Sequence, residues 1–322
     1  MKTNLYPLTF NPVYKDYPWG GSRIPETFHR DLPPGTYAES WEIADHDDGM
    51  SVVANGPLAG RTLREILQAD PSGIVGTRVE GSAFPLLIKL IDAKQKLSVQ
   101  VHPDDASALK HGGEAKTEAW YLLGDNPASV YCGFNKGITK TDFLQAIENG
   151  TTGKTLRKLP LNPGNVVFVR GGNVHAIDAG CLILEVQQNS NTTYRIHDWG
   201  RMGNDGKPRE LHIEQAVHAI DWNDSENPLV EPRLATESEG FQQWELLRCD
   251  YFCLEKIVLS VPHKVPMTGE TFHALFAAKG KATLSWEGGG ETLNTGESIL
   301  VPAALPGYTL DGKDSTLLRM SV

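Results

Sequence analysis

The sequence predicts a mainly β protein that folds as a sandwich or a barrel. Short apolar runs recur along the whole chain, and turn residues separate them. The 322 residues include 32 Gly and 20 Pro, and 40% are hydrophobic. This composition is typical of a folded soluble protein and argues against a disordered, collagen-like or coiled-coil chain. At about 100–200 residues per domain, the length predicts two domains or one large β unit.

The apolar runs give the expected strands. In the first two-thirds of the chain they cover 85–93, 96–102, 118–124, 165–171, 181–188 and 192–199. In the last third they cover 253–261, 273–280, 281–288 and 297–303.

Three helices are expected between these strands. Thr62 and Glu65 form a capping-box pattern at the start of one helix. A second helix is predicted within 139–150, with Thr139 at its start and Gly150 at its end. Around residues 212–220, apolar side chains recur at helical spacing, which predicts an amphipathic helix.

A polar, Pro-containing stretch after Trp222 predicts a connection between two domains, residues 1–242 and 243–322. Segments 163–175 and 295–307 share a pattern of Gly, a polar residue, four mostly apolar residues and a loop. Counted from Gly164 and Gly296, Gly307 takes the position of His175. The chain is therefore expected to hold two copies of one β unit, with a metal-ligand candidate only in the first.

Charge and cysteine content narrow the function class. Thirty Lys and Arg against forty Asp and Glu give a formal charge of -10 without a long basic run, which argues against nucleic-acid or anionic-membrane partners. The N-terminal segment has no apolar signal-peptide core, and no apolar stretch approaches the ~18 residues of a membrane span. The four cysteines form no CxxC pair, and buried free thiols are favoured over a metal site for Cys249 and Cys253. We expect a cytoplasmic protein.

Polar side chains in the strand KLSVQVHPDD suggest a cavity. Because side chains alternate between the two faces of a strand, Ser98, Gln100 and His102 share one face. Pro103 ends the strand and leaves His102 at its mouth.

Glu118 begins another strand, and His175 follows a glycine turn. Two histidines, one glutamate and Gln100 as a fourth donor are a plausible ligand set for a divalent metal, Zn²⁺ first. A His₂Glu set with an open position is typical of a catalytic site. Spacing alone leaves a second interpretation equally open, in which each histidine is a satisfied polar residue of a β protein.

Two basic residues are further candidates. One strand face is expected to carry Thr193, Arg195 and His197. Arg195 can bind a phosphate or an oxyanion. The alternative is an ordinary surface ion pair. Lys89 stands between apolar neighbours, where burial of a lysine is costly. We expect its side chain to face the cavity, the alternative being that it extends to the surface.

Together these segments resemble type I mannose-6-phosphate isomerases, in particular the short bacterial form. The matching pieces run in the family's order and cover most of the first two-thirds of the chain. They are PWGG (18–21), AESWEIA (38–44), FPLLIKLIDA (84–93), LSVQVHPDD (97–105), KTEAWYLLG (116–124), GNVHAI (172–177) and QQNSNTTYRIHDWGR (187–201).

The resemblance implies a double-cupin fold with a small interposed helical part and one zinc ion per chain. Residues 1–242 would be the catalytic cupin domain and residues 243–322 a second, cupin-like domain. The family's metal ligands fall on Gln100, His102, Glu118 and His175, with Gln100 the weakest. Its active-site arginine falls on Arg195, and Lys89 and Lys116 match lysines of the same cleft.

The implied reaction is the interconversion of mannose 6-phosphate and fructose 6-phosphate through an enediol. In this interpretation Arg195, Lys116 and Lys89 are catalytic, and Ser98, Lys116 and Arg195 bind the substrate. The partner is a small sugar phosphate, and we expect a monomer or a weak homo-oligomer. Two alternatives are an iron-dependent oxygenase, since two His and a carboxylate also bind Fe(II), and a non-catalytic sugar-phosphate-binding cupin.

Overall fold

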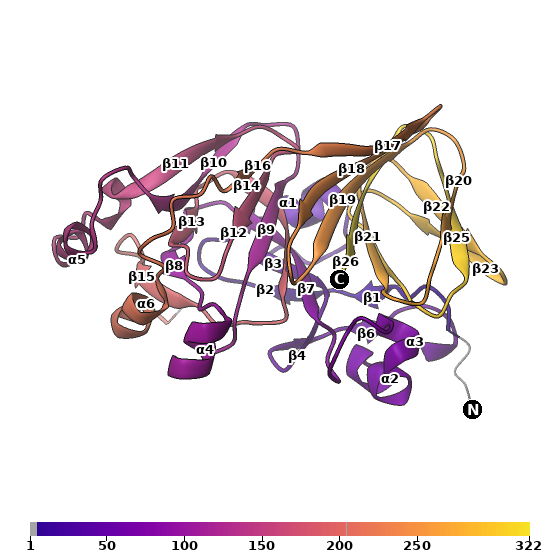
Figure 1. The fold of residues 1–322 in the computed structure, drawn as a ribbon, viewed down its shortest axis with the longest axis horizontal. Coiled ribbons are helices and arrows are strands. Elements are labelled where there is room, and N and C mark those ends of the chain that lie inside the picture. Colours follow the sequence, from indigo (N-terminus) through magenta and orange to yellow (C-terminus); the bar gives the residue numbers. More distant parts are fainter. Residues whose placement is uncertain (1–4, 204) are drawn as a thin grey trace. The chain divides into compact units, whose positions relative to one another are not determined.

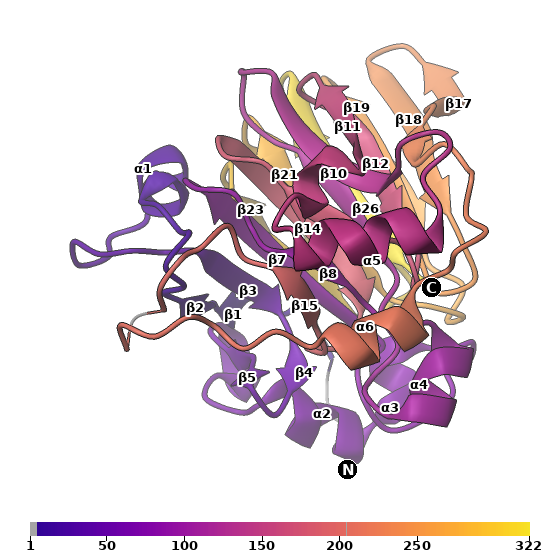
Figure 2. The same ribbon diagram turned by 90° about the vertical axis from the view of Figure 1, so that its left-hand side faces the viewer.

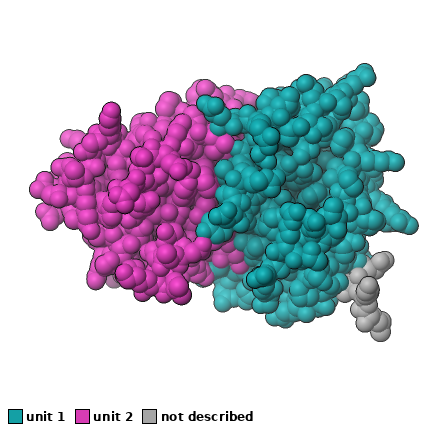
Figure 3. Space-filling view, viewed as in Figure 1, with its two compact units in different colours: residues 1–13, 41–88, 231–322 teal, residues 14–40, 89–230 magenta. Residues whose placement is uncertain are grey.

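The computed structural model describes residues 5–203 and 205–322 and shows a mainly β chain with six short α-helices in those ranges (Figure 1). The chain divides into two units, coloured in Figure 3. Unit 1 comprises residues 1–13, 41–88 and 231–322, and unit 2 comprises residues 14–40 and 89–230. The boundary expected at 242/243 stays a prediction. In the described part of the chain, no helix is long and apolar enough to span a bilayer.

Two sheets contain the strands of unit 2. The larger has the order β16-β12-β9-β14-β7-β3-β2. Its strands are β16 (Leu229–Val230), β12 (Val166–Val169), β9 (Glu118–Leu122), β14 (Cys181–Gln188), β7 (Leu86–Ala93), β3 (Glu39–Ile43) and β2 (Val13–Lys15). The smaller has the order β11-β10-β13-β8-β15. Its strands are β11 (Leu156–Leu161), β10 (Ala128–Phe134), β13 (His175–Ile177), β8 (Val99–Val101) and β15 (Tyr194–His197).

The core of unit 2 lies between these sheets. Trp120 and Ile183 from the larger sheet and Val130 and Ile177 from the smaller belong to one buried apolar cluster. The outer face of the smaller sheet is covered by α5 (Lys140–Glu148) and α6 (Ile213–Ala219), which lie in front of it in Figure 2. One face of the smaller sheet therefore packs inward and the other packs against helices, as its apolar alternation requires.

Two sheets also form the barrel of unit 1. The first has the order β17-β18-β19-β26-β21-β24 and the second β20-β25-β22-β23. The first contains β17 (Arg233–Ser238), β18 (Phe241–Arg248), β19 (Cys253–Leu259), β26 (Ser315–Ser321), β21 (His273–Lys279) and β24 (Ser298–Val301). The second contains β20 (His263–Pro266), β25 (Gly307–Gly312), β22 (Ala282–Trp286) and β23 (Gly289–Leu293).

The two barrels repeat one strand pattern, as the paired glycine segments predict. In chain order, β3 and β7 to β14 of the first correspond to β18 to β26 of the second. The sheet orders β12-β9-β14-β7-β3 and β24-β21-β26-β19-β18 then match, as do β11-β10-β13-β8 and β23-β22-β25-β20. The mainly β, double-cupin architecture expected from the sequence is confirmed.

The remaining elements are short. The helices are α1 (Arg23–Phe28), α2 (Leu63–Ala69), α3 (Pro71–Val75) and α4 (Asp105–His111), and the small strand pairs are β1 (Phe10–Asn11) with β6 (Val52–Val53) and β4 (Asp45–His46) with β5 (Gly49–Met50). The predicted capping box is present at α2, where the Thr62 hydroxyl accepts from the Glu65 N–H and the Glu65 carboxylate accepts from the Thr62 N–H. Thr139 and Asp142 form the same motif at α5.

The capping box at α2 gives a stability prediction. Thr62→Ala removes the acceptor of the Glu65 N–H, so we expect the free energy of unfolding to fall by about 1 kcal/mol. Thr62→Ser keeps the hydroxyl and is the matched control, which should stay close to wild type. Chemical denaturation of both variants measures the difference, and equal stabilities would contradict a role for the cap.

Candidate active site

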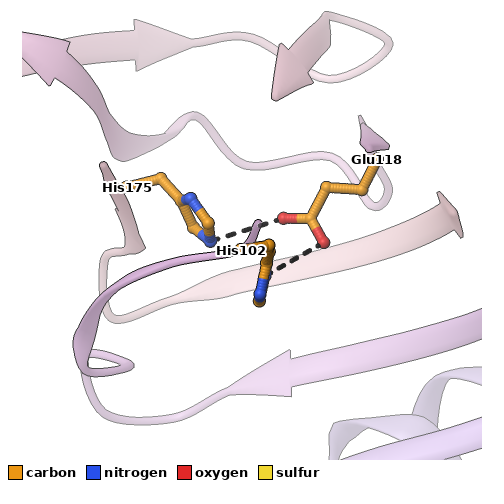
Figure 4. A group of neighbouring side chains, drawn as sticks. All are labelled: His102, Glu118 and His175. Carbon is orange, nitrogen blue, oxygen red and sulfur yellow. Dashed lines mark ion pairs between the residues drawn. The ribbon is translucent and has the colours of Figure 1, made fainter. Parts of the chain in front are cut away.

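Three predicted metal ligands meet inside unit 2. His102 directly follows β8, Glu118 begins β9 and His175 begins β13, and all three are buried. Their ligand atoms lie within 4.8 Å of one another. The two carboxylate oxygens of Glu118 point at the two imidazoles, with Oε2 3.5 Å from His102 Nε2 and Oε1 3.5 Å from His175 Nε2 (Figure 4).

The far nitrogen of each imidazole is held by the backbone. His102 Nδ1 lies 2.8 Å from the Thr192 carbonyl, and His175 Nδ1 lies 2.8 Å from the Asn173 carbonyl. A carbonyl only accepts, so each Nδ1 must carry the proton. Each Nε2 therefore has a lone pair turned toward Glu118, which is the orientation that metal-bound histidines usually have.

The donor set fits a divalent metal. His102 Nε2 and Glu118 Oε1 are buried and have no hydrogen-bond partner among the described residues. Buried polar atoms without a partner destabilise the fold, unless a bound ion or an ordered water satisfies them. Separations of 3.5 Å are close to the roughly 3.4 Å between two ligands that hold one zinc ion tetrahedrally at about 2.1 Å. Gln100 lies nearby, but its amide nitrogen, not its oxygen, is 3.2 Å from His175 Nε2.

Burial sets the charge of the imidazoles. It holds the pKa of His102 well below its usual value and lowers the pKa of His175 to about 4. Both rings are therefore neutral near pH 7, as metal coordination requires. Burial also raises the pKa of Glu118, with the neighbouring Glu185 acting in the same direction and Lys116 against it.

A buried network of charges surrounds this cluster. Lys116 Nζ lies 3.0 Å from Glu118 Oε2 and 3.7 Å from Glu185 Oε1. Lys89 Nζ lies 2.9 Å from Glu185 Oε1 and 3.7 Å from Glu39 Oε2. Burial opposes the charge of Lys89, but Glu185 and Glu39 outweigh it and raise its pKa, so Lys89 is a permanent cation.

The network opens into a cavity of about 260 Å³ within unit 2. Its lining includes four basic side chains, Lys89, Lys116, Arg195 and Arg209. The three metal-ligand candidates are not part of the lining. Gln100 and Lys116 line the cavity and also contact the cluster, so the cluster lies directly behind this part of the wall.

Arg195 lies in the cavity wall beside Gln100, its partner across the β15–β8 pair. Its Nη1 donates to the Glu210 carbonyl at 2.8 Å, whereas its buried Nε has no hydrogen-bond partner in the described residues. The strand register shifts between Arg195 and His197. Thr193 and Arg195 line the cavity, but His197 is not among the described lining residues, so the expected common face does not extend to it.

Four further residues that line the cavity, Glu39, Trp120, Glu185 and Arg209, were not singled out from the sequence. Glu39 and Glu185 bracket Lys89, and the Trp120 indole N–H donates to Glu185 at 2.7 Å. Glu185 stands in the apolar run CLILEVQQ, so the criterion that singled out Lys89 applies to it equally. Arg209 is held by Asp198 through two hydrogen bonds of 2.6 and 2.7 Å, and no sequence pattern marks that pair.

The buried network gives a stability prediction. Lys89→Met keeps the length of the side chain but removes the cation beside Glu185, and breaking a buried ion pair costs about 3–5 kcal/mol. Lys158→Met is the matched control because it also breaks a lysine–carboxylate contact, 2.8 Å to Asp178, with a lysine that is 52% exposed. We expect that change to cost less than about 1 kcal/mol. Urea denaturation measures the free energy of unfolding of both variants, and equal losses would show that the buried network stabilises the fold no more than an exposed ion pair does.

Two family models match the chain. The model of the phosphomannose isomerase type I catalytic domain matches residues 8–126, and that of the mannose-6-phosphate isomerase cupin domain matches residues 243–321. The mannose-6-phosphate isomerase of Streptococcus mutans is 35% identical over 301 residues, which are 91% of this chain and 92% of that protein.

Solved structures of mannose 6-phosphate isomerases also have the fold of this chain. The crystal structure of mannose 6-phosphate isomerase from Bacillus subtilis superposes with a TM-score of 0.90 at 32% identity, covering 98% of this chain and 99% of that one. A mannose 6-phosphate isomerase described as bound with zinc and yttrium has a TM-score of 0.76 at 18% identity, covering 98% of both chains. At that identity the likeness concerns the fold.

These matches favour neither of the alternatives left open by the sequence, the iron-dependent oxygenase and the non-catalytic binding protein. Sequence similarity to isomerases extends over nearly the whole chain, and the described residues bring together three of the four ligands that the resemblance implies, His102, Glu118 and His175. The chain belongs to the family of type I mannose-6-phosphate isomerases, enzymes that interconvert an aldose and a ketose.

Proposed function

We propose that the chain interconverts mannose 6-phosphate and fructose 6-phosphate in the cavity of unit 2, with one zinc ion held by His102, Glu118 and His175. The observation that carries the proposal is the set of two neutral imidazoles and a carboxylate whose ligand atoms face one another. The zinc in a relative of the same fold supports the choice of metal. The four basic side chains of the cavity suit an anionic substrate.

The reaction moves one proton between C1 and C2 of the sugar and a second proton between the two oxygens, through an enediol. Bound zinc supplies Lewis acidity that lowers the cost of negative charge on these oxygens. The protein's own part is to hold the substrate, to place positive charge where the enediol charge develops, and to exclude water.

We assign Lys89 and Lys116 to electrostatic stabilisation and hydrogen-bond donation. The pKa of Lys89 is raised by Glu185 and Glu39, so this lysine donates hydrogen bonds and does not act as a base. Lys116 bridges Glu118 and Glu185, so it couples the metal ligand to the charge network. Gln100 as a fourth ligand would have to present its amide oxygen in place of the nitrogen.

We assign substrate binding to Arg195, with Ser98 and Lys116 as further contacts. The buried Nε–H of Arg195 is available to a phosphate or enediolate oxygen. Ser98 donates to the Gln100 amide oxygen at 3.1 Å, so its hydroxyl oxygen can still accept from a sugar hydroxyl. The cytoplasmic location and the monomeric or weakly oligomeric state stay predictions of the sequence.

Metal removal tests the cofactor. Treatment with a chelator should lower the isomerase rate at least 100-fold, equivalent to about 2.7 kcal/mol of barrier, and added zinc should restore it. A coupled assay with mannose 6-phosphate and elemental analysis of the same samples give both readings. Full activity in a sample with verified metal loss would contradict the zinc proposal.

The ligand set is tested by the same elemental analysis. His175→Ala should purify with much less zinc, because one of three ligands is gone. His197→Ala removes a histidine that lies outside the cluster and is the matched control, expected to keep a full complement of zinc.

Substitution of Arg195 tests the substrate contact. Arg195→Ala should keep the fold and the zinc content but lower kcat by about 10²–10³-fold, the usual effect of losing a donor to developing charge. Arg195→Lys keeps the charge without the planar fork and should lose less. Steady-state kinetics of both variants decide, and near-normal turnover of Arg195→Ala would remove this residue from the catalytic set.

A further inference from the structure

The barrel of unit 1 carries a second polar site at the positions that build the active site in unit 2. In unit 2, Glu118 pairs with Val169 at the end of β12, and Glu185 pairs with Trp120, two residues after Glu118. In unit 1, His273 pairs with Val301 at the end of β24, and Arg319 pairs with Leu275, two residues after His273. His273 and Arg319 therefore occupy the strand positions of Glu118 and Glu185.

The metal-binding function does not recur at these positions. His175 pairs with Gln100 across β13 and β8, and the equivalent pair across β25 and β20 is Gly307 with Pro266. Two residues after Pro266, at the position of His102, stands Thr268. Among the described residues, the only His, Cys, Asp and Glu side chains close enough together to hold a metal ion are those of the cluster in unit 2.

A row of polar side chains does recur, with its charges changed. In unit 2 the row across β3, β7 and β14 is Glu39, Lys89 and Glu185. Across β18, β19 and β26 of unit 1 it is Gln243, Glu255 and Arg319. The Gln243 amide donates to Glu255 Oε1 at 2.7 Å, and Arg319 Nε donates to Glu255 Oε2 at 2.7 Å.

This row borders a cavity of about 290 Å³, which is comparable to the cavity of unit 2. Gln243, His273 and Arg319 line it, and the exposed Lys264 lies at its rim. The side chains of Arg319 and Glu255 are only 11% and 10% exposed. Replacing a buried ion pair by apolar side chains is often neutral or stabilising, so stability alone does not account for this pair.

The lining is rich in hydrogen-bond donors. Both oxygens of Glu255 are already engaged. Arg319 also hydrogen bonds to the Tyr308 hydroxyl, and since a guanidinium has five N–H groups, donors remain for a ligand. Burial lowers the pKa of His273 to about 3, so this ring is neutral. Its Nδ1 lies 2.9 Å from the Tyr308 hydroxyl, and if that hydroxyl donates to Nδ1, the Nε2–H is a further donor.

We propose that this cavity is a second ligand site, which binds a small metabolite through a phosphoryl or carboxylate group held by Arg319. Lys264 at the rim and the donors of Arg319 and His273 favour an oxyanion over an uncharged ligand. The fixed position of the guanidinium, set by Glu255, lowers the entropic cost of binding. The site is separate from the isomerase cavity because all its lining residues belong to unit 1.

The experiment follows His273 by NMR in the full-length protein labelled with [¹⁵N]histidine, with its resonances assigned through His273→Gln. Inorganic phosphate and succinate are titrated separately, and sodium chloride at matched ionic strength corrects for salt. We expect a saturable shift of the His273 side-chain resonances by one of the two anions, with a Kd of about 1 mM or tighter. The responding anion tells which oxyanion the site prefers.

Variants then locate the binding. Arg319→Gln keeps an amide donor for Glu255 but loses the guanidinium, and should weaken binding at least tenfold. Arg248→Gln breaks an exposed arginine–glutamate pair on the same sheet and is the matched control, expected to bind like wild type. Lys264→Glu reverses an exposed rim charge without risk to the core and should also weaken binding, which keeps the test valid if Arg319→Gln does not fold.

Two outcomes would overturn the proposal. One is the absence of a saturable His273 shift with both anions beyond the chloride correction. The other is that both single variants, Lys264→Glu and Arg319→Gln, bind the anion as tightly as wild type. If Arg319→Gln does not fold, unchanged anion affinity of Lys264→Glu is sufficient to overturn the proposal.

Discussion

The buried ion network of Lys89, Lys116, Glu118 and Glu185 is the interaction on which the rest of the site depends. Each of these charges would be strongly unfavourable alone in the barrel, and each is offset by an opposite charge within 4 Å. The sheet makes this arrangement available, because β7, β14 and β9 are neighbours. Lys116 thus holds Glu118 where it faces the two histidines, and a change in the network alters this proposed metal ligand indirectly.

A second constraint links the histidines to the substrate side of the cavity. The Thr192 carbonyl fixes the ring of His102, and only three residues later the same segment supplies Arg195. Arg195 in turn pairs with Gln100, two residues before His102. The strand pair β8–β15, which ends one residue before His102, therefore positions a proposed metal ligand and the proposed substrate arginine together.

Local patterns predicted the local structure well. The expected strands at 85–93 and 181–188 form as β7 and β14, and the helix starts at Thr62 and Thr139 are confirmed by their caps. The convergence of residues 102, 118 and 175 could not follow from spacing, because it depends on which strands become neighbours in two sheets. The residues alone left a metal site and satisfied polar histidines equally open, and the family resemblance favoured the metal site. Glu185 was missed although its burial in an apolar run was readable, and Arg209 was missed because its partner Asp198 lies across a loop.

The two barrels show what the shared strand pattern determines and what it leaves open. Nine strands in the same order place side chains at the same points of each interior, so the scaffold fixes where polar groups can meet. It does not fix their chemistry: the position of a carboxylate in unit 2 holds an arginine in unit 1, and the position of the proposed metal ligand His175 holds Gly307. Unit 1 has glycine at the position of His175, threonine at that of His102 and His273 at that of Glu118, so it lacks the proposed ligand set, and its polar row is satisfied by its own pairs. The divergence thus separates the fold, which both units keep, from the proposed metal site, which needs all three donors at once.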